Sequence, residues 1–168
     1  MFKKGDHVVY GINGPCLVAN VTKLNMPGCD EKRKYYVLQP INSSGSTIYS
    51  PVDNEKVNIR SILTRKEART LLAEAEEIPE VQVESEKTRE VTYKEVLRES
   101  EPRQLVGMVK TLLGKRRERI AQGRKFTAID EKYLKEVMDM LCTELALALG
   151  SKQETATRHL MEKLEEPT

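Results

Sequence analysis

Short runs of β-forming residues dominate the first sixty residues of the chain. The run 7–10 ends at Gly11, 35–38 stops at Pro40 and 47–50 closes at Pro51, while the run 16–22 alternates apolar residues with their neighbours. Short strands separated by turn residues at intervals of about ten residues are typical of small sandwiches and barrels. The pattern predicts a compact five-stranded β-barrel.

From Thr64 onward the apolar positions recur with the period of a helix. Thr64 and Glu67 form a capping box, and apolar residues follow at helical spacing until Pro79 ends the pattern. Residues 80–88 are charged with little periodicity, so we expect a linker or a frayed segment there. A short helix is expected at 93–98.

Three capping sequences predict the later helices. Ser100-Glu101-Pro102 begins a long helix, because proline is tolerated in a first turn. Residues 127–130 cap the next helix, which Gly150 ends, and residues 151–154 cap the last one. The predicted apolar stripe of the long helix consists of Leu105, Val109, Leu112, Leu113 and Ile120.

Strands therefore precede helices along the chain. This segregation predicts an α+β fold, with a β domain at residues 1–62 and an all-α helical bundle at residues 64–168.

The composition excludes several classes of function. Lys and Arg total 28 against 26 Asp and Glu, a net charge of +2, which excludes a uniformly basic binder and an acidic tail protein. No window offers the roughly 20 apolar residues that a membrane span needs. Residues 1–6 contain no apolar signal core. We expect a cytoplasmic protein with no membrane contact.

Residues suited to catalysis are few. Cys16, Cys29 and Cys142 are odd in number and far apart, so neither a disulfide framework nor a zinc site is expected. The chain has no glycine-rich nucleotide loop and no nucleophile motif near its two histidines. We expect no enzyme activity, no metal, no cofactor and no small-molecule substrate.

Charge is distributed unevenly within the helical half. Residues 103–125 contain eight basic residues and one acidic residue, whereas residues 74–101 contain four basic and ten acidic ones. Basic residues recur every seven positions, at Arg103, Lys110, Arg117 and Arg124, which places them along one line of a helix. Such a line suits nucleic-acid phosphates. A solvated helix face and an acidic protein partner remain open alternatives.

The N-terminal sequence indicates the function more specifically than the composition does. Residues 2–10, FKKGDHVVY, followed by Gly14, resemble the opening of the CarD/CdnL family of bacterial transcription regulators. The first module of that family also occurs in transcription-repair coupling factors. Further matches, in the same order and at similar spacing, lie at residues 35–38, 47–51, 57–60 and 144–148.

The resemblance implies a Tudor-like or SH3-like barrel that interacts with RNA polymerase, joined to a helical domain that contacts promoter DNA. Related modules dock on the polymerase β subunit by pairing strand edges. Carried over by position, the polymerase contacts are Lys23, Ser46, Thr47, Ile48, Tyr49 and Ser50. For Tyr49, packing in the barrel or on its surface remains an equal alternative.

Many members of that family insert a tryptophan into the minor groove at the upstream edge of the transcription bubble, but this chain has no tryptophan. Alignment on Arg89 and Tyr93 places the wedge at residues 87–89. Tyr93 could supply the ring or could pack inside the helical domain. The predicted DNA contacts are Lys87, Arg89, Lys94, Arg103, Lys110, Arg116, Arg117 and Arg124.

The resemblance thus predicts a monomeric transcription regulator that docks on the polymerase β subunit, contacts upstream promoter DNA and modulates the stability of the open complex. The alternative is a protein–protein interaction module that has the same barrel and binds no DNA.

Overall fold

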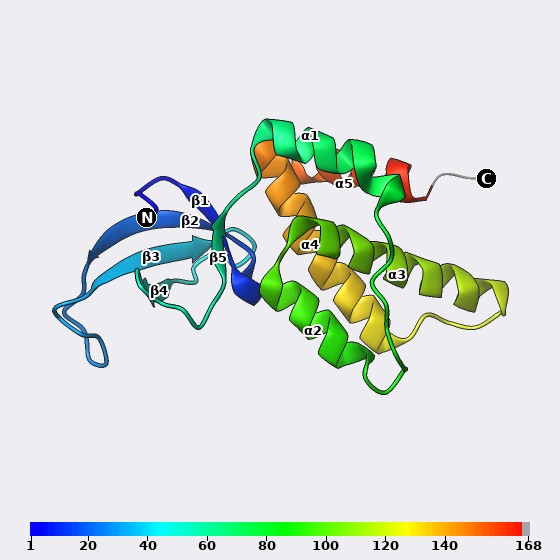
Figure 1. The fold of residues 1–168 in the computed structure, drawn as a ribbon, viewed down its shortest axis with the longest axis horizontal. Coiled ribbons are helices and arrows are strands. Elements are labelled where there is room, and N and C mark those ends of the chain that lie inside the picture. Colours follow the sequence, from blue (N-terminus) through cyan, green and yellow to red (C-terminus); the bar gives the residue numbers. More distant parts are fainter. Residues whose placement is uncertain (166–168) are drawn as a thin grey trace. The chain divides into compact units, whose positions relative to one another are not determined.

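The computed structural model describes residues 1–165, which form two compact units (Figure 1). The first unit, Met1–Ile62, contains all the strands, and the second, which begins at Leu63, contains the long helices. The fold is therefore α+β. Residues 166–168, the end of the predicted helical domain, lie outside the described part of the chain.

The first unit is a five-stranded antiparallel sheet. The strands are β1 (His7–Tyr10), β2 (Pro15–Lys23), β3 (Lys34–Pro40), β4 (Ile48–Pro51) and β5 (Ile59–Ser61), with a short 3-10 helix, η1 (Gly11–Asn13), after β1. Their order in the sheet is β4-β3-β2-β1-β5. One face of the sheet covers an apolar core formed by Val8, Tyr10, Cys16, Val18, Tyr36 and Leu38.

The predicted five-stranded barrel is confirmed in part, because the five strands form one antiparallel sheet but the sheet does not close. Within residues 1–165, β4 pairs only with β3 and β5 pairs only with β1, so the sheet has two open edges. A register shift between Val18 and Asn20 in β2 marks an irregularity that adds twist to the sheet. Closure would require β4 to pair with β5, and these strands of four and three residues offer few ladder bonds.

The three cysteines are free thiols. Cys16 is buried in β2, and this burial raises the pKa of its thiol to about 11. Burial likewise raises the pKa of the Cys142 thiol, in the helical unit. Neither thiol is in the reactive thiolate form at neutral pH.

The second unit is a bundle of five α-helices with one 3-10 turn. The elements are α1 (Arg65–Glu74), η2 (Ala75–Glu77), α2 (Arg89–Glu99), α3 (Pro102–Ala121), α4 (Ala128–Leu149) and α5 (Gln153–Leu164). Helix α4 packs against α1, α3 and α5 and contributes the most buried residues. None of the helices formed by residues 1–165 combines the length and apolar content that crossing a bilayer demands.

Two of the predicted caps and the predicted start of α3 are confirmed, and one cap is corrected. The capping box of Thr64 and Glu67 forms, and Thr127 Oγ1 accepts a hydrogen bond from Asp130 N. Helix α3 begins at Pro102, and the carboxylate of Glu101 caps it. The N-cap of α5 is Lys152, which makes no side-chain cap bond, and the hydroxyl of the preceding serine donates to the Lys152 carbonyl.

The apolar stripe of α3 is confirmed up to Leu113 and wrong at Ile120. Leu105, Val109, Leu112 and Leu113 are buried, whereas Ile120 is 66% exposed. The last eight residues of α3 contain no buried side chain, so this end of the helix lies beyond the core.

The segment predicted to be a linker lies ordered along α3. Val81 N donates to Gly107 O at 3.3 Å, and Thr111 Oγ1 donates to Val81 O at 2.8 Å. A Cβ atom added to Gly107 would lie 2.8 Å from Pro79 O, which is closer than real Cβ contacts. The absence of a side chain at Gly107 therefore permits the close approach.

We expect Gly107→Ala to lower the free energy of unfolding by about 1–3 kcal/mol, because the added methyl group forces Pro79 away from α3. Gly114→Ala is the matched control in the same helix. Its Cβ would meet only side-chain atoms at 3.5 Å or more, so the gain in helix propensity should stabilise by up to about 1 kcal/mol. Urea denaturation of both variants measures the difference, and equal effects would contradict the packing argument.

Candidate functional site: an open sheet edge and a cationic helical surface

The main chain of β4 has hydrogen-bonding groups on the open edge of the sheet. Val52 N donates to Lys34 O at 3.1 Å, and Tyr49 lies opposite Val37. In an antiparallel pair the residues alternate between bonding the neighbouring strand and facing away from it. Val52 bonds the neighbouring strand, and Tyr49 lies an odd number of positions, three, before it. The N–H and C=O of Tyr49 therefore face the open edge.

The side chains of β4 divide into inner and outer ones. Ile48 packs against the sheet core, and Ser50 is buried, where its hydroxyl accepts a hydrogen bond from Tyr10 OH at 3.1 Å. Tyr49 is 42% exposed, so the alternative that it belongs to the core is wrong. Ser50 has a structural role, and Tyr49 is the β4 side chain that a partner could contact.

The other predicted polymerase contacts lie outside β4. Ser46 and Thr47 are exposed in the turn before the strand, where Ser46 N donates to Ser43 O. Lys23 is exposed at the end of β2, opposite Lys34. The structure thus places Ser46, Thr47 and Tyr49 along one stretch of chain, and Lys23 two strands away from it.

Arg89 faces the interior of the helical unit. Its Nε donates to Asp130 Oδ1 at 3.0 Å, and its side chain is only 12% exposed. The same carboxylate accepts hydrogen bonds from Tyr93 OH at 3.1 Å and Thr127 Oγ1 at 2.9 Å. Arg89 therefore joins α2 to the start of α4 and is not available as a phosphate contact.

Tyr93 is fully buried, so the alternative that it replaces the wedge ring is wrong. Burial, followed by the charge of Asp130, raises the pKa of Tyr93 far above its usual value. The phenol therefore stays protonated and continues to donate to Asp130. Its ring packs against Tyr133, with the centroids 5.2 Å apart.

Lys110 also has a structural role. Its Nζ donates to Ala75 O at 3.1 Å, Glu76 O at 2.8 Å and Ile78 O at 2.5 Å. One ammonium thus satisfies three carbonyls at the end of η2, a chain reversal that the sequence pattern did not reveal. Cations near carbonyl ends of helices are favourable electrostatically.

Two of the remaining predicted cations are ion-paired. Arg103 binds Glu74 at 2.7 Å, and Arg116 binds Glu165 at 2.6 Å. Arg124 lies beyond the end of α3. The predicted continuous line of cations is therefore wrong, because Arg103 and Lys110 are engaged within the fold and Arg124 is not on the helix.

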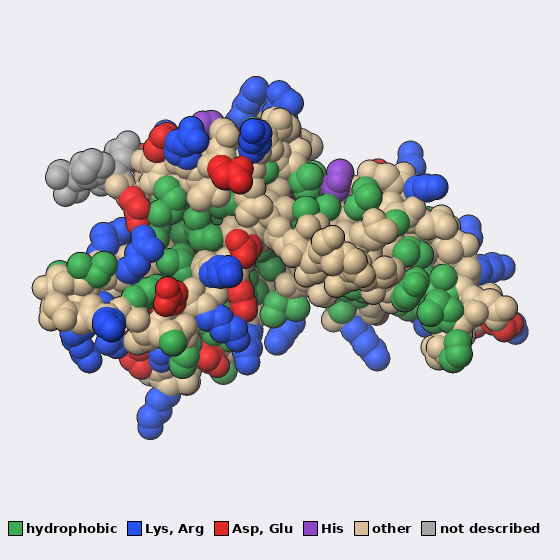
Figure 2. Space-filling model, turned by 180° about the vertical axis from the view of Figure 1, so that it is seen from behind, with side chains coloured by type: hydrophobic (Ala, Val, Ile, Leu, Met, Phe, Trp, Pro, Cys, Tyr) green, Lys and Arg blue, Asp and Glu red, His purple; other side chains and the backbone are tan. Residues whose placement is uncertain are grey.

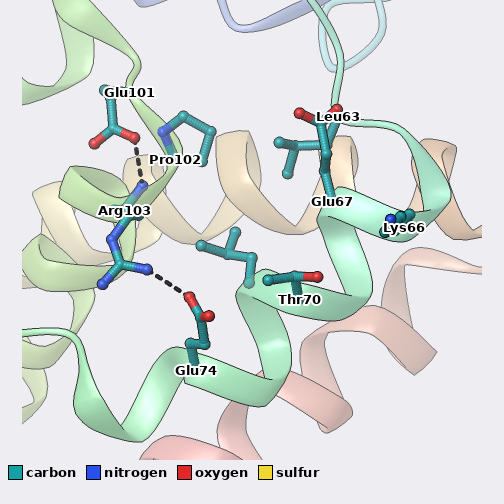
Figure 3. A pocket seen from close by; sticks show the side chains of 9 residues that line it. Leu63, Lys66, Glu67, Thr70, Glu74, Glu101, Pro102 and Arg103 are labelled. Carbon is teal, nitrogen blue, oxygen red and sulfur yellow. Dashed lines mark hydrogen bonds and ion pairs between the residues drawn. The ribbon is translucent and has the colours of Figure 1, made fainter.

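The ion pair of Arg103 lies at the rim of an open pocket between α1 and the start of α3 (Figure 3). The pocket has a volume of about 390 Å³ and apolar walls that include Leu63, Leu71 and Pro102. The sequence pattern gave no sign of it, because its walls come from segments about thirty residues apart. Within residues 1–165 no cluster of three metal-ligating side chains is present, in this pocket or elsewhere.

Four of the predicted DNA contacts are exposed and form no ion pair within residues 1–165, namely Lys87, Lys94, Arg117 and Arg124. Lys87 precedes α2, Lys94 lies on it, and the two arginines lie near the end of α3. Nearby, a hydrogen bond from Lys115 lowers the pKa of the Glu86 carboxyl, although burial opposes the shift. Lysine and arginine side chains lie on several parts of the helical unit's surface (Figure 2).

We expect Lys110→Met to lower the free energy of unfolding by about 1–3 kcal/mol, because three carbonyls lose a charged hydrogen-bond donor. Arg117→Met, on the same helix, removes an exposed and unpaired cation and should change stability by less than about 0.5 kcal/mol. Urea unfolding followed by circular dichroism distinguishes the two. Equal stability of both variants would contradict a structural role of Lys110.

Comparison with known families finds a match for the first unit. Residues 2–63 match the family model of the CarD-like/TRCF RID domain. The match covers the five-stranded sheet and ends where the helical unit begins. No curated protein matches the chain.

Proposed function

From the membership of residues 2–63 in the CarD-like/TRCF RID family of RNA-polymerase-interacting domains, we propose that the protein is a bacterial transcription regulator. It docks on the polymerase β subunit through the open edge of β4. Its helical unit then contacts upstream promoter DNA and changes the lifetime of the open complex. In this proposal the protein acts as a cytoplasmic monomer, without catalysis or a cofactor.

The observation that supports docking most directly is the open edge at Tyr49. A partner strand laid along β4 would pair with main-chain groups, and the exposed phenol would contribute specificity. Pro51 ends the edge, because it has no N–H to donate. This limits the pairing to a short strand and gives it a defined register.

The surface cations support the DNA contact. Lys87, Lys94, Arg117 and Arg124 have no competing carboxylate within residues 1–165, so phosphates can approach them without breaking an ion pair. Such contacts are weak and salt-dependent when isolated. Docking on polymerase raises the local concentration of the helical unit near promoter DNA and makes a weak contact effective.

We expect Tyr49→Pro to lower retention of the purified polymerase β subunit by at least about tenfold, because the edge is deprived of one hydrogen-bond donor and the strand bends. Tyr49→Thr keeps the N–H and removes the ring, so it measures the side-chain contribution separately. Ser61→Pro places the same residue on the opposite open edge and should leave retention unchanged. A pull-down series with immobilised β subunit compares the three variants.

Full retention by Tyr49→Pro, with circular dichroism showing an intact sheet, would exclude β4 as the docking strand. Loss of retention by Ser61→Pro alone would assign docking to β5 instead.

For the DNA contact, we expect the double variant Lys87→Ala/Lys94→Ala to bind duplex DNA more weakly. The slope of log affinity against log salt should fall by about two, roughly one for each lysine that no longer neutralises a phosphate. Arg158→Ala/Lys163→Ala removes two exposed cations from α5, which packs on α1 and α4, and should leave the slope unchanged. Fluorescence anisotropy of a labelled promoter duplex across a KCl series gives both slopes.

Retention on polymerase without any DNA binding would favour the second candidate, a protein–protein interaction module. This second candidate is supported by four predicted DNA contacts that form ion pairs or hydrogen bonds within the fold, namely Arg89, Arg103, Lys110 and Arg116.

A further inference from the structure

The open pocket between α1 and the start of α3 takes no part in the proposed docking or in the proposed DNA contact (Figure 3). All of its lining residues belong to the helical unit. Its volume of about 390 Å³ is within the range of ligand pockets, which is about 300–1,000 Å³. Such pockets combine apolar walls with a few polar groups that orient the ligand. We call it the α1–α3 pocket.

The apolar walls of the α1–α3 pocket are incompletely covered by the fold. Leu71 is 5% exposed and belongs to the core, whereas Leu63 and Pro102 are only half-buried. Covering the apolar surface that these side chains still expose to water would favour binding. The walls therefore suit a ligand with an apolar body.

Two of the carboxylates that line the pocket are already bound to main-chain amides. Glu67 Oε1 accepts a hydrogen bond from Thr64 N at 2.9 Å, in the capping box of α1. Glu101 accepts hydrogen bonds from Arg103 N at 3.1 Å and from Gln104 N at 2.9 Å, at the start of α3. The amide ends of helices have a partial positive charge, which offsets these two negative charges. A cationic ligand would have to compete with both caps.

The other charged groups of the pocket are two cations and one carboxylate. Arg103 Nη1 donates to Glu74 Oε2 at 2.7 Å, and Figure 3 shows Lys66 on the opposite side of the pocket from this pair. The side chains of Arg103 and Glu74 are 50% and 46% exposed, so solvent weakens their attraction. Lys66 is exposed and forms no ion pair within residues 1–165. The balance of these groups favours an anion.

The guanidinium of Arg103 has donors that the fold does not use. Within residues 1–165, its Nε and Nη2 donate no hydrogen bond, because Glu74 is bound by Nη1. A guanidinium presents its N–H groups in a planar fork that matches the two oxygens of a carboxylate. Arg103 can therefore hold a second carboxylate while it keeps its bond to Glu74.

We propose that the α1–α3 pocket binds a small organic acid with an apolar body. The carboxylate of the ligand accepts hydrogen bonds from Arg103 Nε and Nη2, and the apolar body lies against Leu63, Leu71 and Pro102. Lys66 adds positive potential, and Glu74 positions Arg103 at the rim. This inference goes beyond the proposed function, because binding of the acid requires neither polymerase nor DNA.

The test uses the full chain and three probes that share a phenylpropyl body, namely 3-phenylpropanoate, 3-phenylpropan-1-ol and 3-phenylpropan-1-amine. NMR titrations of the backbone amides give the Kd of each probe and the residues it affects. We expect the carboxylate to bind at least about tenfold more tightly than the amine, because it gains charge-assisted hydrogen bonds from Arg103. Its largest shifts should fall on the amides of Thr70, Leu71 and Arg103.

Two rim variants test the sign of the charge effect. Arg103→Met should raise the Kd of 3-phenylpropanoate about tenfold. Arg117→Met removes the same charge from an exposed position of the same helix and should leave the Kd unchanged. Glu74→Gln removes the opposing charge and should lower the Kd by about threefold. A pocket that binds cations would show the opposite effect of Glu74→Gln on the Kd of the amine.

A third variant tests the location of the site. Thr70 is exposed and lines the pocket, so Thr70→Trp should fill the space and abolish carboxylate binding. Ala73→Trp places the same side chain at an exposed position of α1 outside the pocket lining, and it should bind as wild type. Urea denaturation of the variants checks that the helical unit stays folded.

Four results would overturn the inference. The first is tighter binding of the amine than of the carboxylate. The second is equal binding of all three probes with no effect of Arg103→Met, which would leave a nonspecific apolar surface. The third is carboxylate binding that a folded Thr70→Trp variant retains, since the site would then lie elsewhere. The fourth is the absence of any shift in the pocket amides at about 10 mM of the carboxylate.

Discussion

The helical unit depends on the close contact between α3 and the chain that leaves η2. Gly107 lets the main chain of Pro79 and Val81 lie against the helix. One turn later, Lys110 donates hydrogen bonds to three main-chain carbonyls of residues 75–78. With this segment fixed on α3, the chain continues to α2, where Arg89 and Tyr93 meet the carboxylate of Asp130. The position of α2 therefore follows from a glycine and a lysine on another helix.

The same contacts divide the basic residues of the unit into two groups. Lys110 is half-buried and the Arg89 side chain is largely buried, and both donate hydrogen bonds to acceptors of the fold, so replacing either would leave those acceptors without their donor. Lys87, Lys94, Arg117 and Arg124 have no such partners within residues 1–165. The net charge of +2 conceals this division, because it counts both groups alike. A cation that is paired within the fold is not available to neutralise a ligand. In the proposed function, the second group supplies the phosphate contacts.

Much of the fold could be predicted from the sequence because its signals are local. Strand runs, the Thr64 capping box and the apolar stripe of α3 up to Leu113 all depend on neighbouring residues. The roles of Arg89 and Lys110 depend on partners 41 and 35 positions away, which periodicity cannot detect. Whether the sheet closes also depends on distant strands, β4 and β5. Helical spacing continued past the core to Ile120, and only the structure shows that no neighbour covers that residue.

The two units suit a function that combines weak contacts. An edge strand of four residues forms few main-chain bonds, and a handful of surface cations binds DNA weakly at physiological salt. Only three residues separate the end of β5 at Ser61 from the start of α1 at Arg65, and Leu63 among them donates its N–H to the buried Glu144 at 2.9 Å. In the proposed function, a docked sheet would raise the local concentration of the helical unit near promoter DNA, because both units belong to one chain. The effective concentration of its cations would then exceed that of the free protein by far, and binding of both partners would depend on the covalent link between them.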